Sequence, residues 1–130
     1  MFDTGLIIHQ QWLNKIFFEG KTLEMRSRAT SRRGRVGLIE GGSGLIMGAA
    51  TLAGTSGPLG RDEMLALTSR HMIPVDDIVQ GKVDKWKYGW ELENAVKFRN
   101  PVPYTHPHGA VIWVKLPPPV QEAVRKEYFF

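Results

Sequence analysis

Apolar and polar residues follow one another along the chain with two periodicities, one typical of strands and one typical of helices. Short apolar or alternating runs, such as Leu6-Ile7-Ile8, predict strands, because successive strand side chains point to opposite faces. Apolar residues three and four positions apart, such as Val120, Val124 and Tyr128, predict helices. The predicted strands are 6–8, 22–28, 35–40, 45–53, 86–98 and 110–116, and the predicted helices are 11–19, 61–71, 75–79 and 120–130.

The order of these elements predicts an α+β fold. The strands follow one another closely and the helices are few, which favours a mostly antiparallel sheet or a small β-barrel over repeated βαβ units. A length of 130 residues fits one domain, 1–130, and no repeat, low-complexity tract or linker divides it.

Composition excludes several classes of protein. The chain has no cysteine, so disulfides, thiolate metal sites and cysteine nucleophiles are excluded. The longest apolar stretch, 44–54, is half Gly and Ala and is too short to cross a membrane. The N-terminus lacks the basic and then apolar order of a signal peptide. We therefore expect a soluble, cytoplasmic protein without a membrane partner.

The net charge of +4 is concentrated in one segment. Between Lys15 and Arg35 there are seven basic and two acidic residues, whereas the rest of the chain is close to neutral. Such a local excess is typical of a protein that binds a phosphate backbone, although an Arg-rich hairpin can also serve only to keep a protein soluble. Arginine favours bidentate contacts with phosphate. The residues expected to contact a nucleic-acid backbone are Arg28, Arg32, Arg33 and Arg35.

Three charged residues at the start of this segment are candidates for chemistry. Alternation predicts that Glu24 and Arg26 share the charged outer face of a half-buried strand, and Lys21 lies in the turn before it. A partly desolvated Lys beside a Glu could transfer a proton, and Arg26 could hold a phosphate or carboxylate. The alternative is a surface ion-pair ladder without a function.

The stretch from Glu19 to Arg26 resembles the G-x-K-x-x-E-x-R motif of the ASCH (activating-signal-cointegrator homology) domain, a relative of the PUA domain. Lys21, Glu24 and Arg26 match its charged positions, while Glu19 replaces the leading Gly. Further segments resemble the family in the same order along the chain. These are 8–12, with Gln11 where Pro is common, then 88–94, 101–104 and 109–116. The resemblance covers about residues 6–116.

This resemblance implies a compact PUA-like β-barrel with helices at its rim. It also implies a cleft, lined by the Lys-Glu-Arg motif, that holds RNA, a nucleotide or a modified base. Some ASCH proteins are amidohydrolases of N4-acylated cytidine, some have been assigned ribonuclease activity, and others only bind nucleic acid. The amidohydrolases are expected to have a Thr nucleophile where this chain has Glu24, so this chain departs from them.

Histidines and aromatic residues add further candidates. His9 and Trp12 lie at the expected strand-to-helix junction. His9 could reach the cleft or be a hydrogen-bonded structural residue, and Trp12 could line the cleft or fill the core. Tyr104 follows two prolines on a loop. His106 and His108 could form a metal site or an acid–base pair, but two solvated loop histidines fit the sequence better because no third ligand is indicated. His71 is expected to be a cationic partner of a helix C-terminus. We expect no metal and no cofactor.

Trp86, Tyr88 and Trp90 alternate along one predicted strand. They could form a stacking platform for bases or an ordinary aromatic layer of the core.

Three hypotheses follow from the sequence. The first is nucleic-acid or nucleotide binding, with RNA preferred, in a cleft lined by Lys21, Glu24 and Arg26. The second is an enzyme acting on RNA or on a modified nucleoside, as a ribonuclease or an amidohydrolase, with Lys21 and Glu24 as catalytic residues. The third is a protein-interaction module that binds an acidic partner. The oligomeric state is left open.

Overall fold

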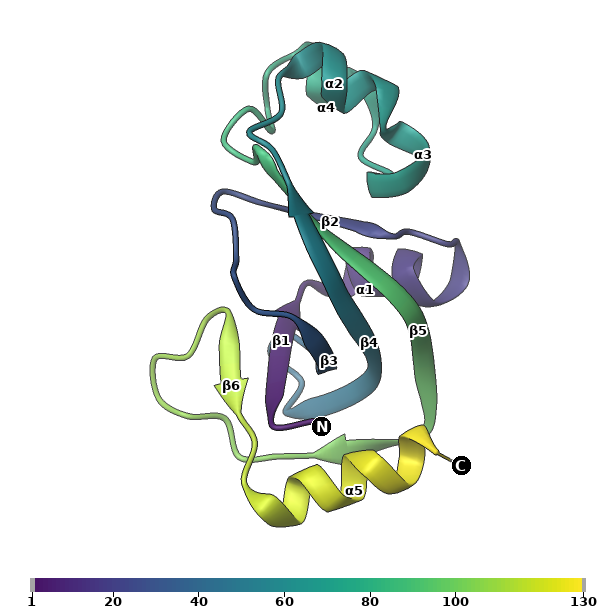
Figure 1. The fold of residues 1–130 in the computed structure, drawn as a ribbon, viewed down its shortest axis with the longest axis vertical. Helices are drawn as coiled ribbons and strands as arrows, with labels where there is room; N and C mark the ends of the chain where they lie inside the picture. The colour runs from purple at the N-terminus through teal and green to yellow at the C-terminus, as the bar shows by residue number, and fades with distance from the viewer. Residues whose placement is uncertain (1, 130) are drawn as a thin grey trace.

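The computed structural model describes residues 2–129, which form six strands and five helices (Figure 1). This confirms the α+β class. The strands are β1 (Thr4–Ile8), β2 (Leu23–Arg26), β3 (Gly34–Glu40), β4 (Leu45–Ser56), β5 (Tyr88–Pro103) and β6 (Trp113–Lys115). The helices are α1 (Gln10–Phe18), α2 (Arg61–Ala66), α3 (Thr68–His71), α4 (Val75–Val79) and α5 (Pro118–Tyr128).

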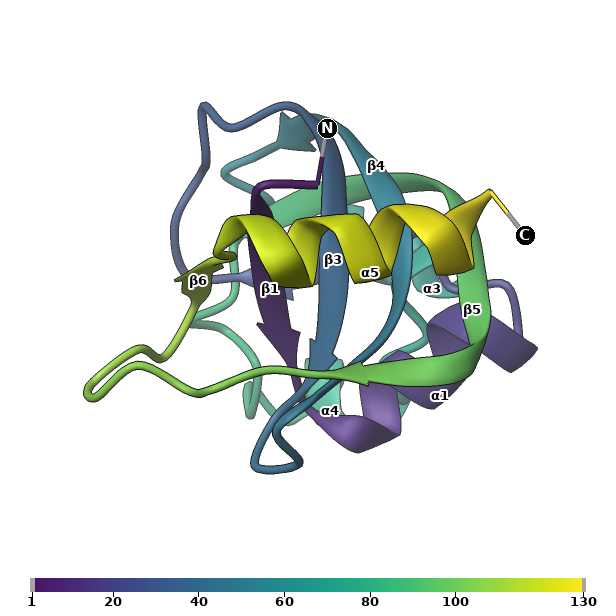
Figure 2. The ribbon, with the colours of Figure 1, turned by 90° about the horizontal axis from the view of Figure 1, so that it is seen from below.

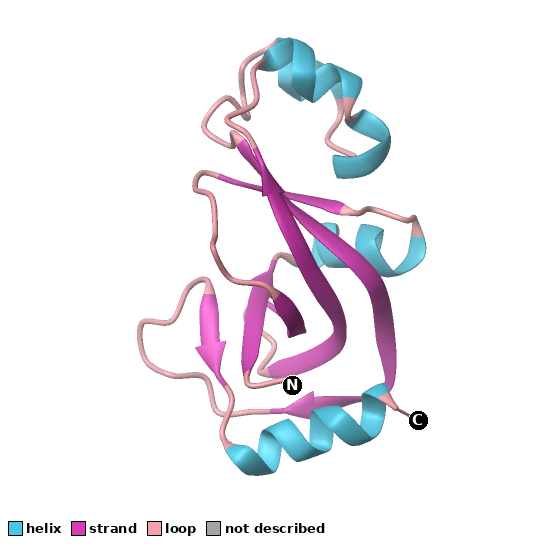
Figure 3. Ribbon diagram, viewed as in Figure 1, coloured by secondary structure: helices cyan, strands magenta, loops and turns pink. Residues whose placement is uncertain are grey.

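All six strands belong to one sheet, in the order β2-β5-β4-β3-β1-β6. Only β1 and β3 run parallel, and the other neighbouring pairs are antiparallel. The long strands β4 and β5 bend strongly, so the sheet curls into a half-barrel (Figure 3). This confirms the predicted small, mostly antiparallel sheet, which here closes only part of the way to a barrel.

Helices lie at the rim of this half-barrel. The short helices α2, α3 and α4 gather at one end, beyond the end of β4 (Figure 1). Helix α5 crosses the opposite end, over β1, β3 and β4 (Figure 2). Helix α1 packs beside the sheet against β3 and β5.

The turn after α1 sets the position of the candidate charged residues. Leu13 and Ile16 on one face of α1 are buried in the core. Gly20 then has a φ of 84°, a left-handed conformation that glycine adopts readily, and it reverses the chain toward β2. Lys21 therefore lies at the entrance of β2, with its backbone N–H bonded to the Lys15 carbonyl at 3.1 Å.

The buried apolar residues form three clusters. The first lies between α1 and the sheet, the second lies under α5, and the third joins β2 to α2, α4 and the segments that flank α3. Trp12 packs against both the first and the third cluster. The junction between the half-barrel and the helical end is therefore where α1, β1 and β2 meet.

The structure corrects several predicted boundaries. The single helix predicted at 61–71 is divided at Leu67, because the Met64 carbonyl accepts bonds from the Leu67 N–H and from the His71 ring. Strand β5 continues to Pro103, since Val102 and Pro103 pair with β4, whereas Trp86 precedes it. Strand β6 is shorter than predicted.

Candidate functional site

Lys21, Glu24 and Arg26 form a cluster of three charges where the chain enters β2. Arg26 donates from Nε and Nη2 to Oε2 of Glu24, at 3.2 and 3.0 Å. Lys21 Nζ lies 3.6 Å from Oε1 of the same carboxylate. Glu24 is thus held between two cations, and the cluster has a net charge of +1.

The prediction that Glu24 lies on an exposed outer face of β2 is wrong. Lys21 and Glu24 are only 3% and 4% exposed. Leu23 and Met25 pack on one side against the helical end, while the other side of β2 faces the interior of the half-barrel and α1. Alternation separates the two faces of a strand, but it cannot tell solvent from a second packed layer.

The ammonium group of Lys21 has three acceptors around it. It donates to the carbonyls of Leu23 at 2.8 Å and His71 at 2.5 Å, and it lies beside Glu24. Its Nζ is also 4.9 Å from the ring centre of Trp12. Burial lowers the pKa of Lys21 to about 8, although the Glu24 carboxylate opposes this shift. Lys21 thus ties the turn after α1 to α3 and to β2.

Arg26 links two strands that are not neighbours in the sheet. Its Nη2 donates to the Ile7 carbonyl of β1 at 2.8 Å, and its guanidinium carbon lies 5.2 Å from the ring centre of Trp90. Because β2 is an edge strand and β1 is near the other edge, this contact bridges the gap in the half-barrel. The bonds to Glu24 and Ile7 use Nε and Nη2, and no bond from Nη1 is found within residues 2–129.

A cavity of about 510 Å³ opens at this gap. Glu24 and Arg26 form part of its polar wall, and the indoles of Trp12 and Trp86 supply flat apolar surface. The residues that line the cavity are Ile7, His9, Gln11, Trp12, Glu24, Met25, Arg26, Gly41, Trp86 and Val111. Four residues that the sequence analysis assigned to the cleft, His9, Trp12, Glu24 and Arg26, are thus brought together at one cavity.

Lys21 lies behind this wall rather than in it. It borders a separate hollow of about 480 Å³ formed with residues of α3 and β5. Tyr104 also lies away from the cavity, where it packs under α5 and its hydroxyl is 2.8 Å from His106 Nδ1.

The four arginines between Arg28 and Arg35 do not line the cavity, and their surroundings differ. The Arg28 carbonyl accepts a 2.7 Å bond from the Trp90 indole. Arg33 bonds to carbonyls of its own loop. Arg35 lies within 6 Å of the rings of three aromatic residues at the two ends of the chain, Phe2, Tyr128 and Phe129.

His71 is not the cationic helix partner that the sequence suggested. It is fully buried, its Nδ1 accepts the Ile73 N–H at 2.9 Å, and its Nε2 is 2.7 Å from the Met64 carbonyl. Because Nδ1 must accept, the ring is neutral with its proton on Nε2. Burial lowers the pKa of His71.

His106 stabilises its own loop through hydrogen bonds that involve both ring nitrogens. Its two ring nitrogens lie 2.8 Å from the Tyr104 hydroxyl and from the Ala110 carbonyl. Within residues 2–129 no group of three or more His, Asp or Glu side chains is arranged to hold a metal ion. No helix of this part of the chain is long and apolar enough to cross a membrane.

Comparison with known proteins identifies the fold. No family model matches the sequence, and no curated protein matches it. Among solved structures, ASCH from Zymomonas mobilis matches with a TM-score of 0.68 and 11% identity, over 95% of this chain and 93% of that chain. The chain has an ASCH-type fold. Two mutant forms of the same ASCH also match, each with a TM-score of 0.64. One form is 13% identical over 95% of this chain and 96% of that chain. The other form is 14% identical over 97% of this chain and 98% of that chain.

This likeness to ASCH concerns the course of the backbone. It confirms the fold that the charged motif implied.

The ASCH-type fold brings residues to the cavity that sequence reasoning did not assign to it. Gln11 was noted only because Pro is common there, and Trp86 only as one of three aromatic residues. Nothing in the sequence pattern marks Gly41 and Val111 as binding residues, because their place at the cavity depends on contacts across the gap in the half-barrel. Of the three aromatic residues, Trp90 is buried in the core and Trp86 reaches the cavity.

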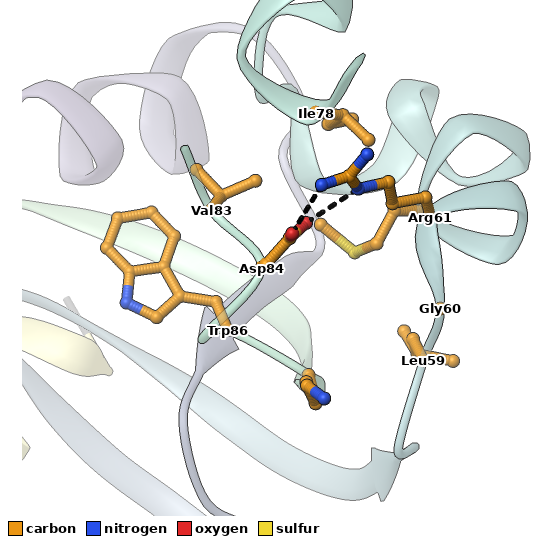
Figure 4. Close-up of a pocket in the computed structure, with 9 residues that line it drawn as sticks. Leu59, Gly60, Arg61, Ile78, Val83, Asp84 and Trp86 are labelled. Carbon is orange, nitrogen blue, oxygen red and sulfur yellow. Dashed lines mark hydrogen bonds and ion pairs between the residues drawn. The ribbon is translucent and has the colours of Figure 1, made fainter. Parts of the chain in front are cut away.

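A smaller hollow of about 220 Å³ is formed by residues of α2, α4 and the segment 83–87, including Trp86 (Figure 4). Arg61 spans it with two bonds to Asp84, at 3.0 and 2.6 Å. Both side chains of this ion pair are about half exposed. Trp86 thus lines both this hollow and the larger cavity.

Proposed function

We propose that the chain binds single-stranded nucleic acid or a nucleotide, with RNA preferred, in the cavity beside Glu24 and Arg26. The observation that carries this proposal is the pairing, in one cavity, of two indole rings with a buried carboxylate–guanidinium pair. Aromatic rings stack on bases, and charged groups beside them bond to base edges and phosphate.

The size and the charge of the cavity support this function. A volume of about 510 Å³ lies within the range of small-ligand sites. Glu24 and Arg26 in the cavity wall balance each other, and Lys21 behind the wall gives the cluster a net charge of +1, which favours an anionic ligand. In this proposal Glu24 accepts a hydrogen bond from a base edge, and Arg26 donates from Nη1 to phosphate or to a base carbonyl.

Lys21 has a supporting role in this proposal. Its ammonium holds Glu24 in place from behind, through the 3.6 Å contact. Removal of Lys21 would therefore weaken binding through the orientation of Glu24 rather than through a lost ligand contact.

The experiment is a binding titration with uridine and adenosine monophosphates and with short oligoribonucleotides, followed by calorimetry and tryptophan fluorescence. Arg26→Lys keeps the charge but loses the planar pair of donors, so we expect affinity to fall by about tenfold. Arg125→Lys is the matched control, because Arg125 pairs with Glu122 on the exposed face of α5.

The proposal is wrong if the wild-type protein binds none of these probes, or if Arg26→Lys and Arg125→Lys bind alike. Single-stranded DNA of the same sequence tests the preference for RNA.

The lowered pKa of Lys21 favours a second candidate, a hydrolase of RNA or of a modified nucleoside. A pKa of about 8 leaves a fraction of Lys21 neutral near pH 7, as proton transfer with Glu24 requires. The test is turnover of oligoribonucleotides and N4-acylated cytidine by wild type and by Lys21→Ala. Turnover that persists in a folded Lys21→Ala variant would exclude this candidate.

A further inference from the structure

A continuous row of side chains leads from the cavity to a surface hollow beside β6. The Arg26 guanidinium lies 5.2 Å from the Trp90 ring centre, and Trp90 stacks on Trp113 with centres 5.5 Å apart and planes 11° apart. The guanidinium of Arg32 then lies 4.6 Å from the Trp113 ring centre. Arg26 lines the cavity, and Arg32 lies at the other end of the row.

Arg32 is held in this position by a chain of hydrogen bonds. Its Nη1 donates to the Thr4 hydroxyl at 3.0 Å, and that hydroxyl donates to Asp3 Oδ1 at 3.2 Å. Thr4 is buried, whereas Arg32 is exposed. The guanidinium is thus ordered before any ligand arrives, which reduces the entropy lost on binding.

Arg32 borders a hollow of about 400 Å³ on the surface. Lys115, which pairs with Thr4 across β1 and β6, contributes a second cation to its wall. Asp3 also lines the hollow, and its carboxylate accepts a hydrogen bond from the Thr4 hydroxyl. With two cations and one carboxylate, the hollow has an excess of one positive charge.

The neighbouring arginines lack these features. Arg33 donates from Nη1 to the carbonyls of Thr30 and Arg32, at 2.7 and 2.8 Å. Arg35 lies among aromatic rings beside α5. Arg35 shares a hollow with Arg125, but Arg125 is paired with Glu122, whereas Lys115 beside Arg32 forms no ion pair within residues 2–129.

We propose that this hollow, formed by Arg32, Lys115 and Trp113, is a second subsite that binds a backbone phosphate of a single-stranded RNA whose base occupies the cavity. The inference rests on the proposed function. Because the row of contacts separates the two sites by only three side-chain steps, a strand of a few nucleotides spans them. The affinity should then increase from a single nucleotide to a short oligonucleotide.

The test measures fluorescence anisotropy of labelled oligouridylates of two, four, six and eight nucleotides, with unlabelled uridine monophosphate as competitor. Arg32→Ala should weaken the binding of the longer probes by about tenfold, reduce the salt slope by about one, and leave the affinity for the mononucleotide unchanged. Lys115→Ala should act in the same direction. Arg33→Ala is the matched control, since it removes the same charge from the same loop.

Arg32→Lys distinguishes a lost contact from a lost structure, because it keeps the charge and removes the planar stack on Trp113. An intermediate affinity for the longer probes supports the subsite. If Arg32→Ala and Arg33→Ala lose the same affinity for the longer probes, the effect is one of net charge and the subsite is overturned. A loss of affinity for the mononucleotide in Arg32→Ala would also overturn the subsite.

The subsite inference and the proposed function can fail separately. If the wild type binds the mononucleotide but gains nothing with length, only the subsite is wrong. If it binds neither mononucleotide nor oligonucleotide, both are wrong.

Discussion

The Lys21 ammonium lies 3.6 Å from the Glu24 carboxylate, and neither side chain has more than a few per cent of its surface in contact with solvent. A buried ion pair contributes little net stability, because desolvation offsets most of the attraction. This pair is nevertheless tied on both sides, Lys21 to two backbone carbonyls and Glu24 to Arg26. It therefore holds the turn after α1 and the wall of the cavity as one unit.

The stability of the protein should rise with pH above about 8 through Lys21. The pKa of Lys21 is lowered from 10.5 to about 8 in the folded state, so between these values the unfolded chain binds more protons. The free energy of unfolding should then increase by about 3 kcal/mol between pH 8 and pH 10.5. Urea unfolding of wild type and Lys21→Met across this range isolates the effect, because only the wild type has it. Parallel curves for the two proteins would contradict the prediction.

Acid should destabilise the fold through His71. Its pKa is lowered from 6.5, so as the pH falls below 6.5 the unfolded chain takes up a proton that the folded protein resists. Nitrogen-15 NMR of the imidazole should show the neutral Nε2–H form of His71 persisting below pH 6.5. A His71 ring that becomes protonated at the ordinary histidine pKa of 6.5 would refute the assignment.

Glu24→Gln should be strongly destabilising. The substitution leaves Lys21 and Arg26 close together without a carboxylate, and we expect the free energy of unfolding to fall by about 3 kcal/mol. Glu122→Gln, at an exposed ion pair with Arg125, should have a much smaller effect. Denaturant unfolding at pH 7 measures both variants. Equal effects would mean that the cluster around Glu24 is as well solvated as a surface pair.

Arg35→Ala should affect the anchoring of α5 rather than ligand binding. Its guanidinium lies 5.9, 5.1 and 5.4 Å from the ring centres of Phe2, Tyr128 and Phe129. Loss of these contacts should cost about 1 kcal/mol and increase hydrogen exchange in the last turn of α5. Arg33→Ala is the control, and a drop in RNA affinity specific to Arg35→Ala would point instead to a ligand contact.

Gly41→Leu should reduce nucleotide binding without unfolding the protein. Gly41 lines the cavity, and a Cβ there would meet its neighbours only at ordinary distances, 3.5 Å to Ile7 and 3.7 Å to the Ile8 carbonyl. Its added bulk lies beside the binding space. Gly60→Leu, at the smaller hollow lined by α2, is the matched control. Calorimetric affinity for uridine monophosphate and thermal melting together decide whether the cavity is the site.

Much of the fold could be predicted because its signals are local. The alternation in 22–28 and the helical spacing in 120–130 correspond to β2 and α5. The errors occurred where contacts outside the periodic pattern decide where an element ends. The helix predicted at 61–71 is divided because the His71 ring folds back to the Met64 carbonyl. Strand β5 continues past Pro101 because Val102 and Pro103 pair with β4.

The candidate site was only partly predictable for the same reason. The charged motif placed Glu24 and Arg26 on one strand face, and local spacing is enough for that. Trp86 reaches the cavity because the helical end packs on β2. Val111 reaches the cavity because its loop lies at the gap in the half-barrel where the cavity opens. Contacts between residues so far apart in the sequence leave no periodic trace.

The sequence by itself determined the elements, their order, the ASCH-like motif and the position of the excess charge, since each of these depends on neighbouring residues. The tertiary structure decided which charges are buried and which arginines share a surface. Glu24 became part of a buried wall because helices cover one face of β2 and the half-barrel covers the other. Arg32 and Arg35, three residues apart, were directed to different sites because one meets Trp113 and the other meets the end of α5.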